Sequence, residues 1–378
     1  MRPLGLYVHV PWCAARCGYC DFNTYVPRDG EDTGWFAAAA RAELELARRT
    51  LGADAGPLAT VFIGGGTPTL LGAQELVAVL DSAEEILGLA PGAEVTVEAN
   101  PETVDAAKLS ALREGGVTRV SLGMQSAAAH VLATLDRLHS PGRAVDAARE
   151  ARAAGFEHVS LDLIYGTPGE TAADWDASLD AALSAGPDHV SAYALTVEAG
   201  TRLHAQVRRG DLPAPDGDVL AERYEAADDR FSAAGLHWYE VSNWAASNAA
   251  RCHHNLGYWR GSDWWGVGPG AHSHVDGRRW WNVRLPDTWR RRLEQGDSPV
   301  AGEEALDAAT RRFERIMLEV RLSDGLDLGV LATGDGGGPE AARALEREGL
   351  LVTNGDGRAR LTRPGRLRAD HVVRVLTG

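Results

Sequence analysis

Short apolar runs alternate with longer amphipathic stretches over the first 235 residues. The runs predict strands at Gly5–Val10, Thr60–Ile63, Glu94–Glu98, Arg119–Leu122, His158–Ile164 and His189–Leu195. The stretches between them predict helices at Gly34–Arg49, Ala73–Leu87, Val104–Glu114, Ala144–Ala153, Ala172–Ser184 and Val219–Ala234. Strands that alternate with helices are typical of parallel β/α units. Six such units predict an α/β fold, a partial (β/α)6 barrel, and His237–Ser242 is a candidate seventh strand.

The pattern changes after residue 235. Seven of the eleven tryptophans lie between Trp238 and Trp281, in a segment rich in His, Asn and Gly. From about Ala305, two helices, two short strands and a final helix resemble a small winged-helix-like α+β domain, with a loop at Gly334–Gly338. We therefore predict a barrel over 1–235, a Trp/His-rich connecting segment over 236–300 and a C-terminal domain over 301–378. The predicted linker is Leu293–Glu304.

Composition and charge exclude several classes of protein. The 378 residues are 44% hydrophobic, enough for a large core, and 38 basic against 53 acidic residues give a net charge of −15. Such an acidic chain is not expected to bind nucleic acid generally, because phosphates attract basic surfaces. No apolar run is long enough to cross a bilayer, and the first residues lack the pattern of a signal peptide. We therefore expect a cytoplasmic protein without a transmembrane segment.

Three of the four cysteines follow the first predicted strand. Cys13, Cys17 and Cys20 have the spacing C-x3-C-x2-C, whereas Cys252 is far away in sequence. Clustered cysteines in a reducing compartment favour metal binding over disulfides. Three local thiolates suit an iron–sulfur cluster that keeps one iron open. The alternatives are buried thiols or a zinc site completed by Cys252 or a histidine, although zinc sites usually pair cysteines as C-x2-C.

Polar and glycine-rich motifs follow the other predicted strands. Active sites of α/β barrels lie at this end of the strands. The glycines Gly64–Gly66 lack the lysine of a phosphate-binding loop, so they either make a tight turn or let the backbone approach a ligand. Glu98, Gln125, Arg137 and Asp162 together suit a zwitterionic small molecule with hydroxyls. Glu98 could accept from an amine, Arg137 could pair a carboxylate, and Asp162 could take ribose hydroxyls.

The motifs as a set resemble a known family. They are Y-V-H-V-P-W-C-x3-C-x-Y-C-D-F, G-G-G-T-P, E-A-N-P, S-L-G-M-Q-S, D-L-I-Y-G-T-P-G and Y-E-V-S-N-W, in this order from about Leu4 to beyond His274. They are similar to the radical S-adenosylmethionine (SAM) proteins related to oxygen-independent coproporphyrinogen III oxidase. The resemblance implies that Cys13, Cys17 and Cys20 bind a 4Fe–4S cluster. It implies a SAM pocket lined by Tyr7, Tyr19, Gly65, Gly66, Thr67, Glu98, Gln125, Arg137, Asp162 and Ala194.

Two features favour the heme-chaperone branch of this family. Position 22 is Phe22, where the oxidase pattern continues with another cysteine, and the oxidase's N-terminal extension is missing. The segment that starts at Cys252 contains H-N-x-x-Y-W, in which His254 is a candidate heme ligand beside Tyr258 and Trp259. A histidine in a Trp-rich segment could equally be structural. His9, His253, His272 and His274 are competing candidates.

The sequence therefore leaves three functions open. The first is a chaperone with a 4Fe–4S cluster and SAM that binds heme and passes it to an acceptor protein, for example one of the respiratory chain or the membrane. The second is a radical SAM oxidoreductase acting on a porphyrin, so whether the protein is an enzyme stays open. The third is a winged-helix regulator that senses redox state through the cluster. Acidic residues that offset the arginines of the C-terminal domain make DNA binding the weakest of these.

Overall fold

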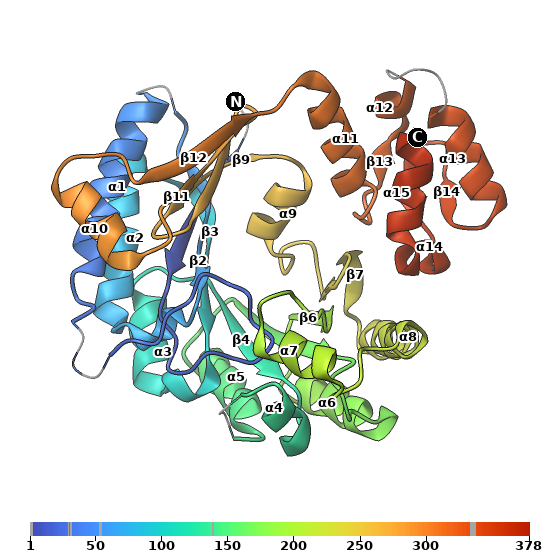
Figure 1. The fold of residues 1–378 in the computed structure, drawn as a ribbon, viewed down its shortest axis with the longest axis horizontal. Coiled ribbons are helices and arrows are strands. Elements are labelled where there is room, and N and C mark those ends of the chain that lie inside the picture. Colours follow the sequence, from blue (N-terminus) through green and yellow to red (C-terminus); the bar gives the residue numbers. More distant parts are fainter. Residues whose placement is uncertain (1–2, 29, 31, 53–54, 138–139, 333–337) are drawn as a thin grey trace.

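Six parallel strands form the centre of the fold. The computed structural model describes residues 3–28, 30, 32–52, 55–137, 140–332 and 338–378. The central strands lie side by side in chain order (Figure 1). They are β1 (Leu4–Val10), β2 (Leu58–Gly65), β3 (Leu89–Ala99), β4 (Arg119–Gln125), β5 (His158–Tyr165) and β6 (His189–Ala194). All six predicted strands are confirmed. Most of their apolar residues are buried, as expected of a parallel sheet covered by helices.

The helices that connect these strands cover the outer face of the sheet. They are α1 (Phe36–Leu51), α2 (Ala73–Leu87), α3 (Ala106–Glu114), α5 (Arg143–Ala153), α6 (Ala172–Ser184) and α8 (Gly217–Ala233). Each predicted helix is present within three residues of its expected bounds. Local signals set their starts: Thr171 and Asp174 form a capping box at the start of α6. Two short helices, α4 (Ala129–Thr134) and α7 (Arg202–Arg209), were not predicted.

The connecting segment extends the sheet at both ends. Strand β9 (Asp263–Val267) pairs in parallel with β1. Beyond it, β10 (His272–Val275), β11 (Arg278–Asn282) and β12 (Val300–Ala305) are antiparallel. At the other end, β8 (Asn243–Ala245) pairs antiparallel with β6, and β7 (His237–Glu240) pairs with β8. The sheet therefore has twelve strands and runs from β12 to β7, which makes an open, partial barrel.

Two sequence predictions differ from this topology. The candidate seventh strand exists as β7, but it is antiparallel and at the edge, because no crossover helix follows it and only residues 241–242 separate it from β8. The predicted linker Leu293–Glu304 is not free. It contains the end of α10 (Pro286–Glu294) and most of β12, which pairs with β11. The division of the chain at 235 and 300 stays a prediction, and β12 argues for placing the last boundary after Ala305.

The C-terminal part has its own core and its own small sheet. It contains α11 (Ala308–Glu319), β13 (Leu326–Asp327), α12 (Leu328–Ala332), α13 (Gly338–Arg347), β14 (Leu351–Thr353), β15 (Arg358–Leu361), α14 (Arg363–Leu367) and α15 (Ala369–Thr377). The three strands are antiparallel in the order β13-β15-β14. The arrangement agrees with the winged-helix-like prediction. Most of the predicted loop Gly334–Gly338 lies outside the described residues.

Ion pairs hold the C-terminal part against the barrel. Arg366 donates two hydrogen bonds to Asp228 on α8, of 3.0 and 2.7 Å, and its guanidinium lies 4.6 Å from the centre of the Trp238 ring. Arg363 pairs with Asp229 on the same helix at 2.7 Å. Two of the arginines of the small domain are therefore already engaged by acidic side chains. None of the helices in the described ranges is both long and apolar enough to cross a membrane.

Candidate functional site

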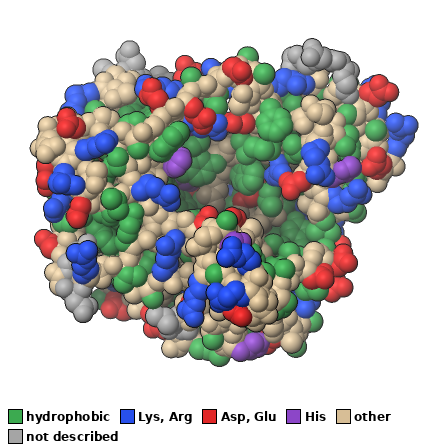
Figure 2. Space-filling view, in the orientation of Figure 1, with side chains coloured by type: hydrophobic (Ala, Val, Ile, Leu, Met, Phe, Trp, Pro, Cys, Tyr) green, Lys and Arg blue, Asp and Glu red, His purple; other side chains and the backbone are tan. Residues whose placement is uncertain are grey.

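A cavity of about 530 Å³ lies inside the partial barrel and reaches the C-terminal ends of its strands. Figure 2 shows that this face of the molecule is hollowed near its centre, with hydrophobic side chains along much of the hollow. The cavity collects twelve of the fourteen predicted site residues: Cys13, Cys17, Cys20, Tyr19, Gly65, Gly66, Thr67, Glu98, Gln125, Arg137, Asp162 and Ala194. Tyr7 and His254 are the two that do not line it. The strand-end argument therefore predicted which residues come together.

The three clustered cysteines are half-buried on one loop at the cavity mouth. Burial raises the pKa of the Cys13 thiol, and Cys20 and Cys17 raise it further as neighbouring negative groups. The Arg137 guanidinium lies on the other side, with Nη1 3.5 Å from the Cys17 sulfur. In the described part of the chain, no three His, Cys, Asp or Glu side chains converge closely enough to hold a single metal ion. The triad therefore suits a cluster, in which each thiolate binds a different iron, better than a zinc site.

The glycine run closes the space between the ends of β1 and β2. Gly66 donates its backbone N–H to Val10 over 2.7 Å, and Thr67 donates to the Trp12 carbonyl over 2.7 Å. A Cβ at Gly66 would lie 2.5 Å from the Trp12 carbonyl oxygen, and one at Gly65, whose φ is +110°, would lie 2.6 Å from the His9 ring. Any larger residue would push the cysteine loop away from the cavity. The run thus serves close backbone approach as well as the turn.

Two buried charged groups face the cavity without a full set of partners. Glu98 accepts a hydrogen bond of 3.1 Å from the Gly65 N–H. Burial, and then the nearby Asp162 carboxyl, raise the pKa of Glu98 to about 7. Arg137 donates to the Gly123 carbonyl over 3.0 Å, but its buried Nε has no hydrogen-bond partner among the described residues. A buried donor without a partner is costly, so this arginine is suited to an anionic ligand group.

Gln125 and Asp162 complete the polar wall. Gln125 has a φ of 62°, in the left-handed region that non-glycine residues rarely adopt. Such strain is concentrated at ligand sites. The Asp162 carboxylate accepts a hydrogen bond of 2.8 Å from the Ser121 hydroxyl. Burial raises the pKa of Asp162, while hydrogen bonds from Ser121 and Ser191 and the charge of Arg137 lower it. Together with Glu98 and Arg137, these side chains present both signs of charge to a small polar molecule.

Tyr7 lies on a second cavity, of about 570 Å³, on the other side of the cysteine loop. Its hydroxyl is 2.9 Å from His9 Nδ1, and His9 Nε2 is 2.9 Å from the Asn23 carbonyl oxygen. The Asn23 side chain donates to the carbonyls of Pro269 and Arg284, over 3.0 and 2.9 Å. The loop that carries the cysteines is thereby tied to the segment that forms the second cavity. Among the described residues, Phe22 alone lines both cavities.

His254 is buried and both of its ring nitrogens are engaged. Nδ1 is 2.8 Å from the Thr60 hydroxyl and Nε2 is 2.8 Å from the Tyr258 hydroxyl. The ring also stacks on Phe62, with 5.2 Å between ring centroids. Burial lowers the pKa of His254 to about 4, so the ring is neutral. In this conformation His254 acts as a structural residue at the start of α9 (His253–Trp259), and ligation of heme iron would require it to give up a hydrogen bond. Its role as a heme ligand stays a prediction.

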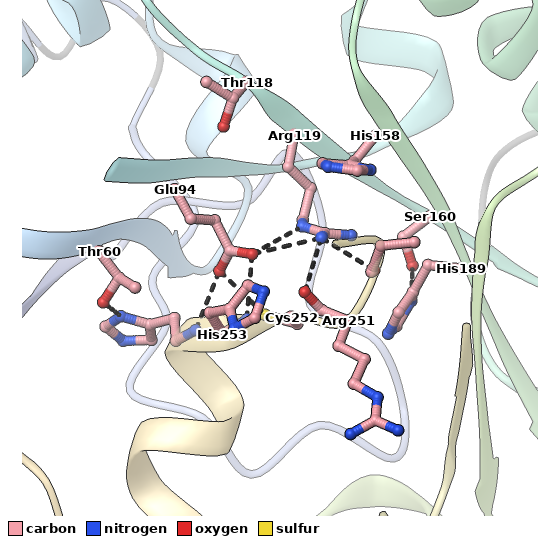
Figure 3. Close-up of polar contacts among 12 residues, drawn as sticks. Thr60, Glu94, Thr118, Arg119, His158, Ser160, His189, Arg251, Cys252 and His253 are labelled. Atoms are coloured by element: carbon pink, nitrogen blue, oxygen red, sulfur yellow. Dashed lines mark hydrogen bonds and ion pairs between the residues drawn. The ribbon is translucent and has the colours of Figure 1, made fainter. Parts of the chain in front are cut away.

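The floor of the first cavity contains an ion pair that the sequence analysis missed. Figure 3 shows Glu94 of β3 and Arg119 of β4 pointing toward each other, with Cys252 and His253 beside them. The side chains are 7% and 1% exposed, and Arg119 Nη2 is 3.2 Å from Glu94 Oε2. Arg119 also donates to the carbonyls of Ala250 and Arg251 at 2.9 Å. Glu94 accepts the backbone N–H groups of His253 and His254 at 3.0 and 2.9 Å.

This pair therefore fixes the start of α9 against the sheet.

Cys252, the cysteine that is not part of the triad, belongs to the same group of buried side chains. The Cys252 thiol is buried and lies 3.6 Å from Glu94 Oε1. Burial raises the pKa of this thiol well above its usual range. Cys252 is thus placed as an uncharged structural residue.

Polar residues at every second position of the predicted strands would have identified the residues on the cavity floor. In β4, β5 and β6 the polar residues occupy alternate positions, Arg119 and Ser121, Ser160 and Asp162, and His189 and Ser191, and all six line the cavity. Side chains two apart in a strand share one face, so polar residues at this spacing inside apolar strands mark a polar interior. Of these six residues only Asp162 is among the predicted site residues, because the strand-end pattern does not report the other five.

Comparison with known proteins finds close relatives over the whole chain. A model of the radical SAM superfamily matches residues 7–182. The heme chaperone HemW of Mycobacterium tuberculosis strain H37Rv is 55% identical over 379 residues, which cover 100% of this chain and 95% of that protein. HemW of Bacillus subtilis strain 168 is 32% identical, with 98% of each chain covered.

A solved structure shares the fold at much lower sequence identity. Coproporphyrinogen III oxidase (HemN) from Escherichia coli, a radical SAM enzyme, superimposes with a TM-score of 0.80. The match covers 100% of this chain and 90% of that chain, at 20% sequence identity. This likeness concerns the fold of both the barrel and the C-terminal part.

Proposed function

Because the chain belongs to the HemW family of heme chaperones, within the radical SAM superfamily, we propose that it binds heme and transfers it to an acceptor protein. The observation that carries the proposal is the 55% identity to a named heme chaperone over the full chain. The first cavity supports the cofactors that this superfamily implies, a 4Fe–4S cluster and SAM. The acceptor is a further partner of the proposal, and nothing in the described residues specifies it.

The residues of the first cavity fit both cofactors. Cys13, Cys17 and Cys20 would hold the cluster through three thiolates. The cluster would supply an electron to bound SAM, which is the chemistry of the superfamily. Arg137, whose Nε is unpartnered, would pair the carboxylate of SAM, and Glu98 would accept its ammonium. Asp162 would accept from ribose hydroxyls.

Heme titration tests the proposed function. We expect the anaerobically reconstituted, cluster-loaded chain to bind hemin, with a saturable shift of the Soret band. The same heme-loaded sample should then lose this band when it is mixed with an apo-cytochrome that takes up heme. If the Soret band of hemin mixed with the chain does not differ from that of hemin in buffer alone, the proposal is contradicted.

A porphyrin oxidoreductase is the second candidate, favoured by the shared fold with coproporphyrinogen III oxidase. Position 22 argues against it, because Phe22 stands where the oxidase pattern has a cysteine and is 58% exposed at the edge of both cavities. An anaerobic assay of the cluster-loaded chain, reduced with dithionite and supplied with SAM and coproporphyrinogen III, separates the two. Decarboxylation in proportion to SAM consumed would support the oxidoreductase, and heme binding without decarboxylation would support the chaperone.

Glu98 should make SAM binding depend on pH. Its pKa is raised to about 7, so lowering the pH from 8 to 6 protonates the carboxyl that would accept the SAM ammonium. Binding below pH 7 must then release this proton, and the affinity should fall by roughly tenfold per pH unit. Equilibrium dialysis of SAM against the cluster-loaded chain at pH 6, 7 and 8 measures the slope.

Glu98→Gln is the matched control for this slope. The amide does not titrate, so the variant should bind SAM more weakly at pH 8 and with little change down to pH 6. An equally steep slope in the variant would assign the pH dependence to another group, with Asp162 as the neighbouring candidate.

A further inference from the structure

The second cavity is walled by aromatic rings. Tyr7 of β1, Phe22 of the cysteine loop, Tyr258 of α9, Trp264 of β9 and Trp281 of β11 all line it. Its volume of about 570 Å³ falls within the range of about 300–1,000 Å³ typical of small-molecule sites. Aromatic faces from five separate elements favour a large, flat and apolar ligand.

Most polar groups on these walls already have protein partners. The Tyr7 hydroxyl is bonded to His9 and the Tyr258 hydroxyl to His254, both at hydrogen-bond distance. Trp264 donates its Nε1–H to the His272 carbonyl over 3.0 Å. These side chains therefore offer ring faces rather than free donors.

His272 differs from the other polar residues of this cavity. Within the described ranges no hydrogen bond engages its ring nitrogens, and its ring stacks on Trp281 with 5.9 Å between centroids. The side chain lies at the exposed edge of the cavity. Partial desolvation there, and then the charges of Arg284 and Arg279, lower the pKa of His272. The ring is therefore neutral near pH 7, with a lone pair free to bind a metal. Glu304 is the one facing group that opposes this shift.

An arginine lies at the edge of the same cavity. Arg284 lines it, and its Nε reaches Asn23 Oδ1 only at 3.4 Å, at the exposed rim. Arg279, in contrast, is held by Glu304 and Glu314 at 2.9 and 3.0 Å. Arg284 can therefore turn its guanidinium to a carboxylate of a bound ligand.

We propose that the second cavity is the heme site of this chain, with His272 as the axial ligand and Arg284 as the partner of a propionate. Heme has an apolar ring system, a metal that can take a further ligand and an anionic edge. The aromatic walls suit the ring, His272 suits the metal and Arg284 suits the anionic edge. The proposal rests on the proposed heme-binding function and deepens it by placing the site away from the fully hydrogen-bonded His254. It also separates heme from the cavity that suits SAM.

Hemin titration of four variants tests the placement, with each chain cluster-loaded and full length. We expect His272→Ala to weaken hemin binding by roughly tenfold or more and to change the ferric heme signal in electron paramagnetic resonance, because the iron loses its histidine ligand. His237→Ala, which removes an exposed histidine of β7, is the matched control and should leave both readouts unchanged. His254→Ala, in a chain that circular dichroism shows to be folded, should keep the ferric heme signal of the wild type.

Arg284→Ala tests the anionic edge. We expect it to weaken hemin binding by roughly twofold to fivefold, as is usual for a partly exposed ion pair. Hemin dimethyl ester, which lacks free propionates, should bind the wild type and this variant equally. If Arg284→Ala weakens the binding of hemin and of hemin dimethyl ester equally, Arg284 is not the partner of a propionate.

The outcomes separate this inference from the proposed function. If the wild type does not bind hemin, the function itself fails. If the wild type binds and His272→Ala binds as tightly with an unchanged ferric heme signal, the placement is wrong. Loss of the signal only in folded His254→Ala would then assign the iron to His254.

Discussion

Cys17→Ala is expected to remove the iron–sulfur cluster from the reconstituted protein. Cys17 is the central thiol of the triad and the one that Arg137 Nη1 approaches to 3.5 Å. With two thiolates left on the loop, an open four-iron cluster loses one of its three protein ligands. We expect iron and sulfide to fall from about four per chain to near background, with loss of the brown absorbance near 400 nm.

Cys252→Ser is the control for this prediction. Cys252 is buried in the cavity floor and lies 3.6 Å from Glu94, so it contributes to structure, and serine keeps a donor at that position. Iron and sulfide in Cys252→Ser should match the wild type. Full iron and sulfide in Cys17→Ala would refute the three-cysteine site, and their loss in Cys252→Ser would revive a four-cysteine one.

Arg119→Ala is expected to cause the largest loss of stability. It would leave the Glu94 carboxylate buried without its counter-ion, and it would leave the carbonyls of Ala250 and Arg251 without their donor. Breaking a buried ion pair from one side typically costs about 3–5 kcal/mol. Urea unfolding followed by circular dichroism, with the cluster absent in all samples, measures this difference.

A surface pair provides the comparison. Arg113 and Glu157 form an ion pair at 2.9 Å, shorter than the 3.2 Å of the buried pair, but their side chains are 31% and 57% exposed. Arg113→Ala should change the free energy of unfolding by less than about 1 kcal/mol. Equal effects of the two substitutions would mean that the Glu94–Arg119 pair is better solvated than its burial indicates.

The same substitution should also loosen the start of α9. Hydrogen exchange at the N–H groups of His253 and His254 should become faster in Arg119→Ala and stay unchanged in Arg113→Ala.

The central strands and the first site could be predicted because their signals are local. Buried parallel strands give short apolar runs, and a barrel brings the ends of those runs to one place, which located Glu98 and Asp162. Strand β9 could not be predicted this way. Its register against β1 joins Trp264 to Gly5, and no short-range pattern reports a pairing between residues so far apart.

Long-range contacts also explain why the sequence singled out His254 as a candidate heme ligand. The motif around it is local, but its partner Thr60 lies 194 residues earlier in the chain. Only the fold shows that both ring nitrogens are already bonded. The opposite holds for His272, whose sequence surroundings resemble those of the other candidates. His9 also lines the second cavity, but both of its ring nitrogens are hydrogen-bonded, whereas no hydrogen bond among the described residues engages those of His272. For candidate ligands, the decisive property is which of their atoms remain unbonded, and this depends on long-range packing.

The tie between the cysteine loop and the second cavity has a consequence for cells exposed to oxygen. Asn23, three residues after Cys20, holds the backbone of Arg284, and Phe22 forms a wall of both cavities. Oxidative loss of the cluster would remove the iron shared by the three cysteines, and any movement of this loop that follows would reach the wall of the second cavity through Phe22 and Asn23.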